Sequence, residues 1–215
     1  MTDFSQSIVQ EFRHMKAYQE IPSTYHEFGN IDLQKDRRAM LTVNGIGLAI
    51  MIVMVVGMSF FRPIRALFDM SRGLGPYTLR FVVLILGYIV YIVLHELTHA
   101  CVMRLAGGRD VQFGFTGMYA YAGSEVDYFD RSAYFCIALA PLTVWFIVFL
   151  VIGSCMPPDW FWVLYLLQIG NVAGSAGDVY VTLRVLKMPG DTLIMDTGTR
   201  TTFLSQADRE EALNQ

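Results

Sequence analysis

Charged side chains are scarce in this sequence of 215 residues. Asp, Glu, Lys and Arg make up 16% of it, whereas hydrophobic residues make up 54%. This composition is too apolar for a soluble domain of this size and is typical of a membrane protein. The sequence also lacks any block of Lys and Arg with interleaved aromatic residues, so it indicates no nucleic-acid partner.

Cysteine is rare as well, and we expect no cleaved secretory signal. Three cysteines lie apart in apolar segments without CxxC or Cys/His spacing, which argues against a disulfide framework and against a thiolate zinc site. They are Cys101, Cys136 and Cys155. The first 38 residues are polar and contain no apolar core of a signal peptide, so we expect insertion to rely on internal segments.

Long hydrophobic runs, by contrast, are abundant. Four are long enough to cross a bilayer, which takes about 20 apolar residues. The fold class expected is therefore all-α integral membrane, a four-transmembrane-helix bundle. Two consecutive prolines, Pro157 and Pro158, separate the last two spans. The expected organisation is a cytoplasmic arm (1–38), a single transmembrane domain (39–187) with helices at about 39–61, 78–105, 131–156 and 159–187, and a cytoplasmic tail (188–215).

The N-terminal arm carries apolar residues at helical spacing, namely Phe4, Ile8, Phe12 and Met15. This pattern fits an amphipathic helix on the membrane surface and equally a soluble helix that packs on the rest of the protein. His14 and His26 have no partner at metal-binding spacing, so we interpret both as surface histidines.

The distribution of Lys and Arg predicts the orientation in the membrane. With the N-terminus inside, twelve of the sixteen basic residues fall on the cytoplasmic side. Only Arg62, Arg65, Arg72 and Arg80 fall outside. We therefore expect a multi-pass protein of the cell membrane with both termini in the cytoplasm.

The second apolar run contains His95-Glu96-Leu97-Thr98-His99. Residues four apart lie one turn apart on one helix face, so both imidazoles can bind a single metal ion. A Zn²⁺ ion held by three protein ligands keeps a position for water, and Glu96 can take the proton of that water. The alternative is a structural His-Glu pair. Ionisable groups at the centre of a membrane helix cost about 2.5–3.5 kcal/mol each, which favours the metal site.

The fourth run supplies a candidate third ligand. Asp178 is its only acidic residue between 160 and 187, and it lies at about the same depth as the two histidines. Gly170, Gly174 and Asp178 follow one another at intervals of four, a spacing of small residues that allows two helices to approach closely. Weaker candidates are the acidic residues of predicted loops and tail: Glu125, Asp127, Asp159 and Asp196.

Residues 111–121 form a candidate β-hairpin, re-entrant or membrane-associated, between the second and third helices. Apolar and polar residues alternate there, which is typical of strands. An extended substrate peptide can pair with a free strand edge, and Phe113, Phe115 and Tyr119 are candidate substrate-binding residues. A hairpin that only caps the bundle fits the pattern as well.

With the motif His95-Glu96-Leu97-Thr98-His99-Ala100 and, about 80 residues later, Asn171-Val172-Ala173-Gly174-Ser175-Ala176-Gly177-Asp178, the sequence resembles a family of small bacterial membrane proteins named "putative zincin peptidase". It is more distantly similar to the site-2-protease-like intramembrane metalloproteases. The likeness extends from about residue 40 to 200 and includes Ala140-Pro141.

The resemblance implies a zinc endopeptidase that cuts substrates within or near the membrane. His95, His99 and Asp178 would bind one Zn²⁺ per chain, Glu96 would activate a zinc-held water, and Asn171 would help to hold substrate. The site-2 pattern has prolines between the Asn and the Asp and a glycine after the Asp. Here Gly, Ala and Ser intervene and Val179 follows.

Two other functions compete with the protease. One is a non-catalytic metal-binding membrane protein, such as a pseudoprotease that binds client helices. The other is a metal transporter, against which the lack of an internal repeat and of a second ionisable cluster argues. The expected partners are the lipid bilayer and a membrane protein or peptide substrate, and the sequence leaves homo-oligomerisation open.

Overall fold

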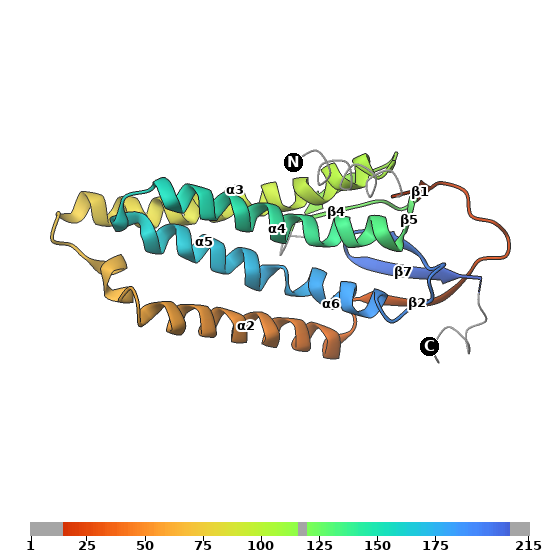
Figure 1. The fold of residues 1–215 in the computed structure, drawn as a ribbon, viewed down its shortest axis with the longest axis horizontal. Coiled ribbons are helices and arrows are strands. Elements are labelled where there is room, and N and C mark those ends of the chain that lie inside the picture. Colours follow the sequence, from red (N-terminus) through yellow and green to blue (C-terminus); the bar gives the residue numbers. More distant parts are fainter. Residues whose placement is uncertain (1–14, 116–119, 207–215) are drawn as a thin grey trace, which may run out of the picture. The chain divides into compact units, whose positions relative to one another are not determined.

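The structure, a computed structural model, describes residues 15–115 and 120–206 and is mostly helical (Figure 1). Three helices are long and apolar enough to cross a membrane: α2 (Arg37–Ser59), α3 (Leu74–Leu105) and α4 (Arg131–Cys155). The shorter helices are α5 (Phe161–Gly174), α6 (Ala176–Val185) and two 3-10 helices, η1 (Ile64–Phe68) and η2 (Pro158–Trp160).

The fourth predicted span is interrupted rather than continuous. A single helix is expected over 159–187, but α5 ends at Gly174 and α6 begins at Ala176. The Ser175 N–H donates to the Asn171 carbonyl at 3.1 Å, and the neighbouring glycines have poor helix propensity. Each half is shorter than the roughly 20 residues that cross a bilayer. The described residues therefore contain three helices of spanning length and not the four expected.

A five-stranded antiparallel sheet accompanies the helices, which makes the all-α prediction incomplete. Its strand order is β1-β5-β6-β7-β2. The strands are β1 (Ala17–Tyr18), β2 (His26–Asp32), β5 (Tyr128–Asp130), β6 (Leu193–Asp196) and β7 (Arg200–Ser205). The predicted polar arm and tail thus contribute four of the five strands. The helix predicted from Phe4 to Met15 lies almost wholly outside the described residues.

The chain divides into two compact units. The first comprises Met1–Met40, Glu96–Ala140 and Asp178–Gln215, and the second comprises Leu41–His95 and Pro141–Gly177. One boundary thus falls within α3, between His95 and Glu96, and another falls within α4, between Ala140 and Pro141.

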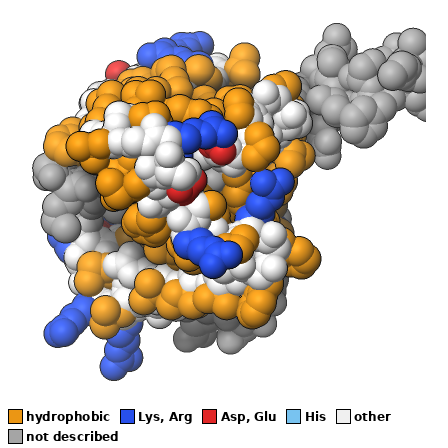
Figure 2. All heavy atoms as spheres, turned by 90° about the vertical axis from the view of Figure 1, so that its left-hand side faces the viewer, with side chains coloured by type: hydrophobic (Ala, Val, Ile, Leu, Met, Phe, Trp, Pro, Cys, Tyr) orange, Lys and Arg blue, Asp and Glu red, His pale blue; other side chains and the backbone are white. Residues whose placement is uncertain are grey.

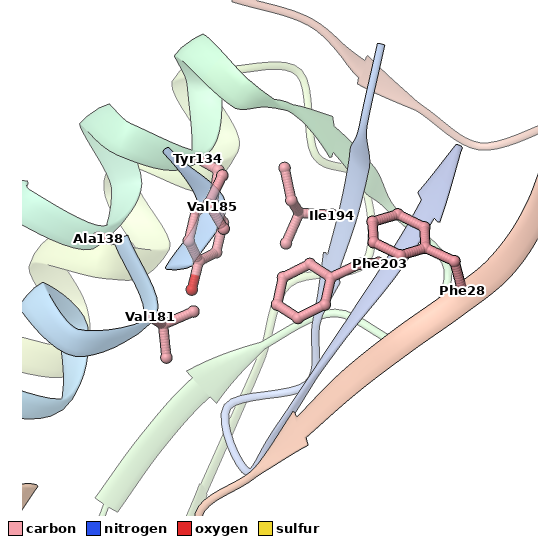
Figure 3. Close-up of a cluster of buried hydrophobic side chains, with 7 residues drawn as sticks. All are labelled: Phe28, Tyr134, Ala138, Val181, Val185, Ile194 and Phe203. Atoms are coloured by element: carbon pink, nitrogen blue, oxygen red, sulfur yellow. The ribbon is translucent and has the colours of Figure 1, made fainter. Parts of the chain in front are cut away.

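The core of the first unit lies between the sheet and the helices of that unit (Figure 3). Phe203 and Ile194 of the sheet are almost completely buried, as is Val185 of α6. Phe28 packs on Phe203 with their ring centroids 6.3 Å apart. Burying side chains of this size contributes about 1.5–3 kcal/mol each, so this cluster anchors the sheet to α4 and α6.

The hairpin predicted at 111–121 is present. Strands β3 (Gln112–Phe115) and β4 (Ala120–Gly123) pair antiparallel, with Gln112 opposite Gly123. The chain reaches this hairpin through a tight helix end, because Gly107 has a positive φ of 97° and the Gly108 N–H donates to the Met103 carbonyl at 2.9 Å. This arrangement is a Schellman motif, which glycine favours.

The second unit is built from close helix contacts. The Tyr88 hydroxyl of α3 donates to the Leu166 carbonyl of α5 at 2.6 Å, and a Cβ on Gly170 would collide with the Tyr88 ring. Gly174, in contrast, faces no atom within 4 Å of where a Cβ would lie. At one end of this unit, hydrophobic side chains surround a few basic and acidic ones (Figure 2).

Candidate metal centre

The centre begins with the helix face that carries the HExxH motif. His95, Glu96 and His99 all lie on α3, and the two histidines are separated by one helical turn. A continuous helix has no freedom to separate residues four apart, so the backbone itself sets the spacing of the two imidazoles. His99 is buried, and His95 is half-buried.

Asp178 approaches His99 within the first unit. It lies in the first turn of α6, directly after the interruption at Ser175, and its Oδ1 is 3.7 Å from Nε2 of His99. His95 continues the same face of α3, and one ligand atom from each of His95, His99 and Asp178 lies within 4.8 Å of the other two. The three residues expected as ligands are thus close enough together to hold one metal ion.

Glu96 borders a small cavity beside these residues. The cavity has a volume of about 100 Å³ and room for several water molecules. Oε2 of Glu96 accepts a hydrogen bond from the Ala122 N–H of β4 at 2.9 Å. The cavity is lined, all from the first unit, by Glu96, His99, Met103, Ala120, Tyr121, Ala122, Tyr134, Ile137, Ala138, Asp178, Asp196 and Gly198.

Two further polar residues, Tyr134 and Asp196, line the cavity. The sequence does not predict that they lie together there. The buried Tyr134 hydroxyl donates to Oδ2 of Asp196 at 3.2 Å, and the Gly198 N–H donates to Oδ1 at 2.8 Å. Burial raises the pKa of the Asp196 carboxyl and the nearby Asp178 adds to this, while both hydrogen bonds and His99 oppose it. Asp196 appears in the sequence only as a weak ligand candidate, because nothing in the sequence signals that β6 passes the HExxH helix.

The structure does not group the remaining weak ligand candidates with the two histidines. Asp127 is fully buried among hydrogen-bond donors, Asp159 of η2 forms an ion pair with Arg72, and Glu125 is exposed. Among the described acidic residues, Asp178 is therefore the one that the structure groups with both histidines.

The residues expected to bind substrate fall into different environments. Phe113 and Phe115 are exposed on β3, with 54% and 71% of their surface accessible. Tyr119 lies outside the described residues. Asn171 is completely buried in the second unit, where its Nδ2 donates to the Leu142 carbonyl at 3.1 Å and its Oδ1 accepts from the Tyr91 hydroxyl at 2.9 Å. It is enclosed by protein and does not line the cavity beside Glu96.

Comparison with known proteins agrees with this geometry. Residues 88–193 match the profile of a family described as "putative zincin peptidase", and this range contains both histidines, Glu96 and Asp178. Over these residues the chain is similar to this family. A 24.7 kDa uncharacterized protein of Pyrococcus woesei is 29% identical over 121 residues, which are 54% of this chain and 52% of the relative. The chain thus spans about half the length of the curated relative it matches, and no solved structure matches it significantly.

The donor set of the cluster suits the zinc that the family description implies. Zinc accepts imidazole nitrogen and carboxylate oxygen at about 2.0–2.2 Å, and catalytic sites provide three protein ligands and keep a fourth position. Two ligand atoms at such distances from a tetrahedral ion are about 3.3 Å apart. Nε2 of His99 and Oδ1 of Asp178 are 3.7 Å apart, so a small shift of the side chains would bring them to the separation expected for two zinc ligands.

Proposed function

We propose that this protein is a membrane-embedded zinc endopeptidase that hydrolyses peptide bonds of membrane or membrane-proximal substrates. The observation that carries the proposal is the grouping of His95, His99 and Asp178 within 4.8 Å, with Glu96 at an adjoining cavity that has room for water. A structural zinc site has four protein ligands, whereas the described residues place three in this cluster. The arrangement therefore favours hydrolysis over a purely structural metal.

Exposed apolar side chains support the membrane assignment. On α3 alone, large hydrophobic residues with more than half of their surface accessible include Ile85, Leu86, Ile89, Val90 and Val93. Surfaces of this size are rare on soluble proteins and are expected against lipid. In this proposal the membrane spans are α2, α3 and α4.

The catalytic work of the chain itself centres on Glu96. Bound zinc would polarise the scissile carbonyl and acidify a water molecule. Glu96 takes the proton of the attacking water and returns it to the leaving amine. The Ala122 N–H holds Oε2 of Glu96, which directs the other carboxylate oxygen to the reaction. The cavity walls from β4 and α4 limit the water that reaches the site.

The outer edge of β3 is the proposed site for an extended substrate segment. Phe113 pairs with Ala122, whose N–H turns away from β3 toward Glu96, so this is a non-hydrogen-bonded pair of the ladder. The backbone groups of Phe113 and Phe115 then point to the other edge of β3, which pairs with no strand among the described residues. A substrate strand added there would use these groups and contact both phenyl rings.

The first test combines metal content with proteolysis by the detergent-purified full chain. We expect about one zinc per chain in the wild type and loss of the metal in His95→Ala and Asp178→Ala. Glu96→Gln should keep the metal and lower cleavage of a labelled, unfolded casein by about 10² to 10⁴-fold. Glu125→Gln, an exposed acidic residue of the same unit, is the matched control. Wild-type protein without metal, or a fully active Glu96→Gln, would contradict the proposal.

A proline substitution tests the substrate edge. Phe113→Pro removes an N–H from the outer edge of β3 and leaves the hydrogen bonds to β4 in place. We expect a higher KM for casein with little change in metal content. Phe113→Ala keeps the N–H and separates the role of the backbone from that of the ring. An unchanged KM in Phe113→Pro would rule out pairing at this edge.

A further inference from the structure

Each histidine of the motif uses its Nδ1 in a hydrogen bond whose partner decides where the imidazole proton lies. Nδ1 of His99 is 2.8 Å from the backbone carbonyl of Ile137. A carbonyl oxygen can only accept, so Nδ1 of His99 must carry the hydrogen. In the neutral ring the lone pair is then on Nε2, the atom that approaches Asp178.

Pro141 explains why the Ile137 carbonyl is suited to this contact. In an α-helix the carbonyl of residue 137 accepts from the N–H of residue 141, four positions later. Position 141 of α4 is proline, which has no N–H and whose ring pushes away the carbonyl four residues before it. The Ile137 carbonyl therefore accepts no hydrogen bond from residue 141 of its own helix and can accept one from Nδ1 of His99.

A second series of hydrogen bonds determines which ring nitrogen of His95 carries the proton. The Leu142 carbonyl can only accept, so the amide of Asn171 must turn its Nδ2 toward it and its Oδ1 toward Tyr91. The Tyr91 hydroxyl gives its single proton to that Oδ1 at 2.9 Å. Its oxygen, 2.9 Å from Nδ1 of His95, must then accept from this nitrogen.

We propose that Pro141 and the pair Asn171–Tyr91 are positioning residues that hold both histidines in one tautomer, protonated at Nδ1, with Nε2 presented to the metal. Partners of this kind fix ring orientation and raise ligand basicity in metal sites. The inference rests on the proposed function for the metal itself. It replaces the substrate-binding role that the resemblance implies for Asn171.

Nitrogen NMR of the metal-free wild type tests the tautomers, and variants are needed only to assign the signals. Long-range ¹H–¹⁵N spectra of protein labelled at its four histidines distinguish Nδ1–H from Nε2–H rings at a pH where imidazole is neutral. We expect His95 and His99 as Nδ1–H rings, with His95→Ala and His99→Ala spectra assigning the signals. A dominant Nε2–H form of either ring would overturn the proposal for that ring.

Metal affinity tests whether the tautomers serve the site. Tyr91→Phe and Pro141→Ala should each weaken zinc binding about 10- to 100-fold in competition with a chelator, the range typical for the loss of such partners. Tyr88→Phe and Pro76→Ala are the matched controls. Tyr88 lies on α3, as Tyr91 does, and its hydroxyl donates to the Leu166 carbonyl of α5. Pro76 lies in the first turn of α3, where a proline removes no helical hydrogen bond.

Stability separates positioning from a general structural role. Pro141→Ala restores a backbone hydrogen bond, so the variant should unfold at a temperature no lower than the wild type while its zinc affinity falls.

Equal affinities of Tyr91→Phe and Tyr88→Phe would overturn the inference and leave the protease proposal intact. A wild type that binds no zinc would overturn the protease proposal, and the metal-free NMR spectra would still decide the tautomers.

Discussion

At the scale of single residues, Asp127 shows how a buried charge is stabilised. Its side chain is fully buried and accepts hydrogen bonds from the side chains of Gln19 and Ser124 and from the N–H groups of Arg109 and Asp110, at 2.8–3.0 Å. Burial alone raises the pKa of this carboxyl, but the four donors outweigh it and hold the pKa below its ordinary value. Asp127 thereby ties β1 to the segment that leaves α3.

Asp127→Asn should destabilise the protein, because the amide cannot accept all four hydrogen bonds. We expect a loss of about 1–3 kcal/mol near neutral pH, measured by thermal unfolding in detergent. A lowered pKa in the folded state stabilises above the unfolded pKa of about 3.9, and this contribution is lost as the pH falls through the folded pKa. The difference between wild type and variant should therefore shrink in acid. Asp110→Asn, at an exposed position, is the control and should be nearly neutral. A pH-independent difference would show that packing, not charge, is responsible.

At the scale of secondary-structure elements, two of the three glycines of α2 lie in different surroundings. A Cβ on Gly47 would lie 3.0 Å from the backbone oxygen of Ala173 in α5, whereas Gly45 has no neighbouring atom within 4 Å. Gly47 thus permits a close helix contact within the second unit, and Gly45 does not take part in it.

Alanine at these two positions should have opposite effects. Gly47→Ala forces apart two backbones that cannot rotate away, and we expect a loss of about 1–3 kcal/mol. Gly45→Ala should be neutral or stabilising by up to about 1 kcal/mol, since alanine favours helix. Unfolding of both variants in detergent, monitored by circular dichroism, measures the difference. Equal stabilities would mean that α2 and α5 do not pack through Gly47 in solution.

The elements also show which features the sequence can predict. The HExxH helix and the hairpin follow from local patterns, since helical spacing and strand alternation each depend on adjacent residues. The five-stranded sheet does not, because its strands are two to seven residues long and come from both end segments and the middle of the chain. For the same reason the sequence could not place Asp196 beside the cavity. Asp178 could be selected as a ligand candidate, because an acidic residue in an apolar run is energetically costly. The break at Ser175 had a visible signal in its neighbouring glycines, but the length of the apolar run favoured one helix.

At the scale of the whole molecule, three of the four basic residues predicted to lie outside have local contacts that can determine their position independently of topology. Arg80 is buried and donates to the carbonyls of Ala66, Leu67 and Asp69, around the end of η1. Arg72 forms an ion pair with Asp159, and Arg62 lies 5.2 Å from the centre of the Phe161 ring. Because these arginines make structural contacts at their positions, their location is compatible with an orientation predicted from the other twelve basic residues.

Cysteine labelling in intact cells tests this orientation. After replacement of the three native cysteines by serine, Met70→Cys in the segment between η1 and α3 should react with a membrane-impermeant maleimide from outside. Gln206→Cys, directly after β7, should react only once the membrane is permeabilised, because the first unit with its cavity is expected on the cytoplasmic side. Met70 and Gln206 are both exposed, so accessibility within the fold does not bias the comparison. The reverse pattern would invert the protein and place the cavity beside Glu96 at the outer face, where it would meet extracytoplasmic substrates.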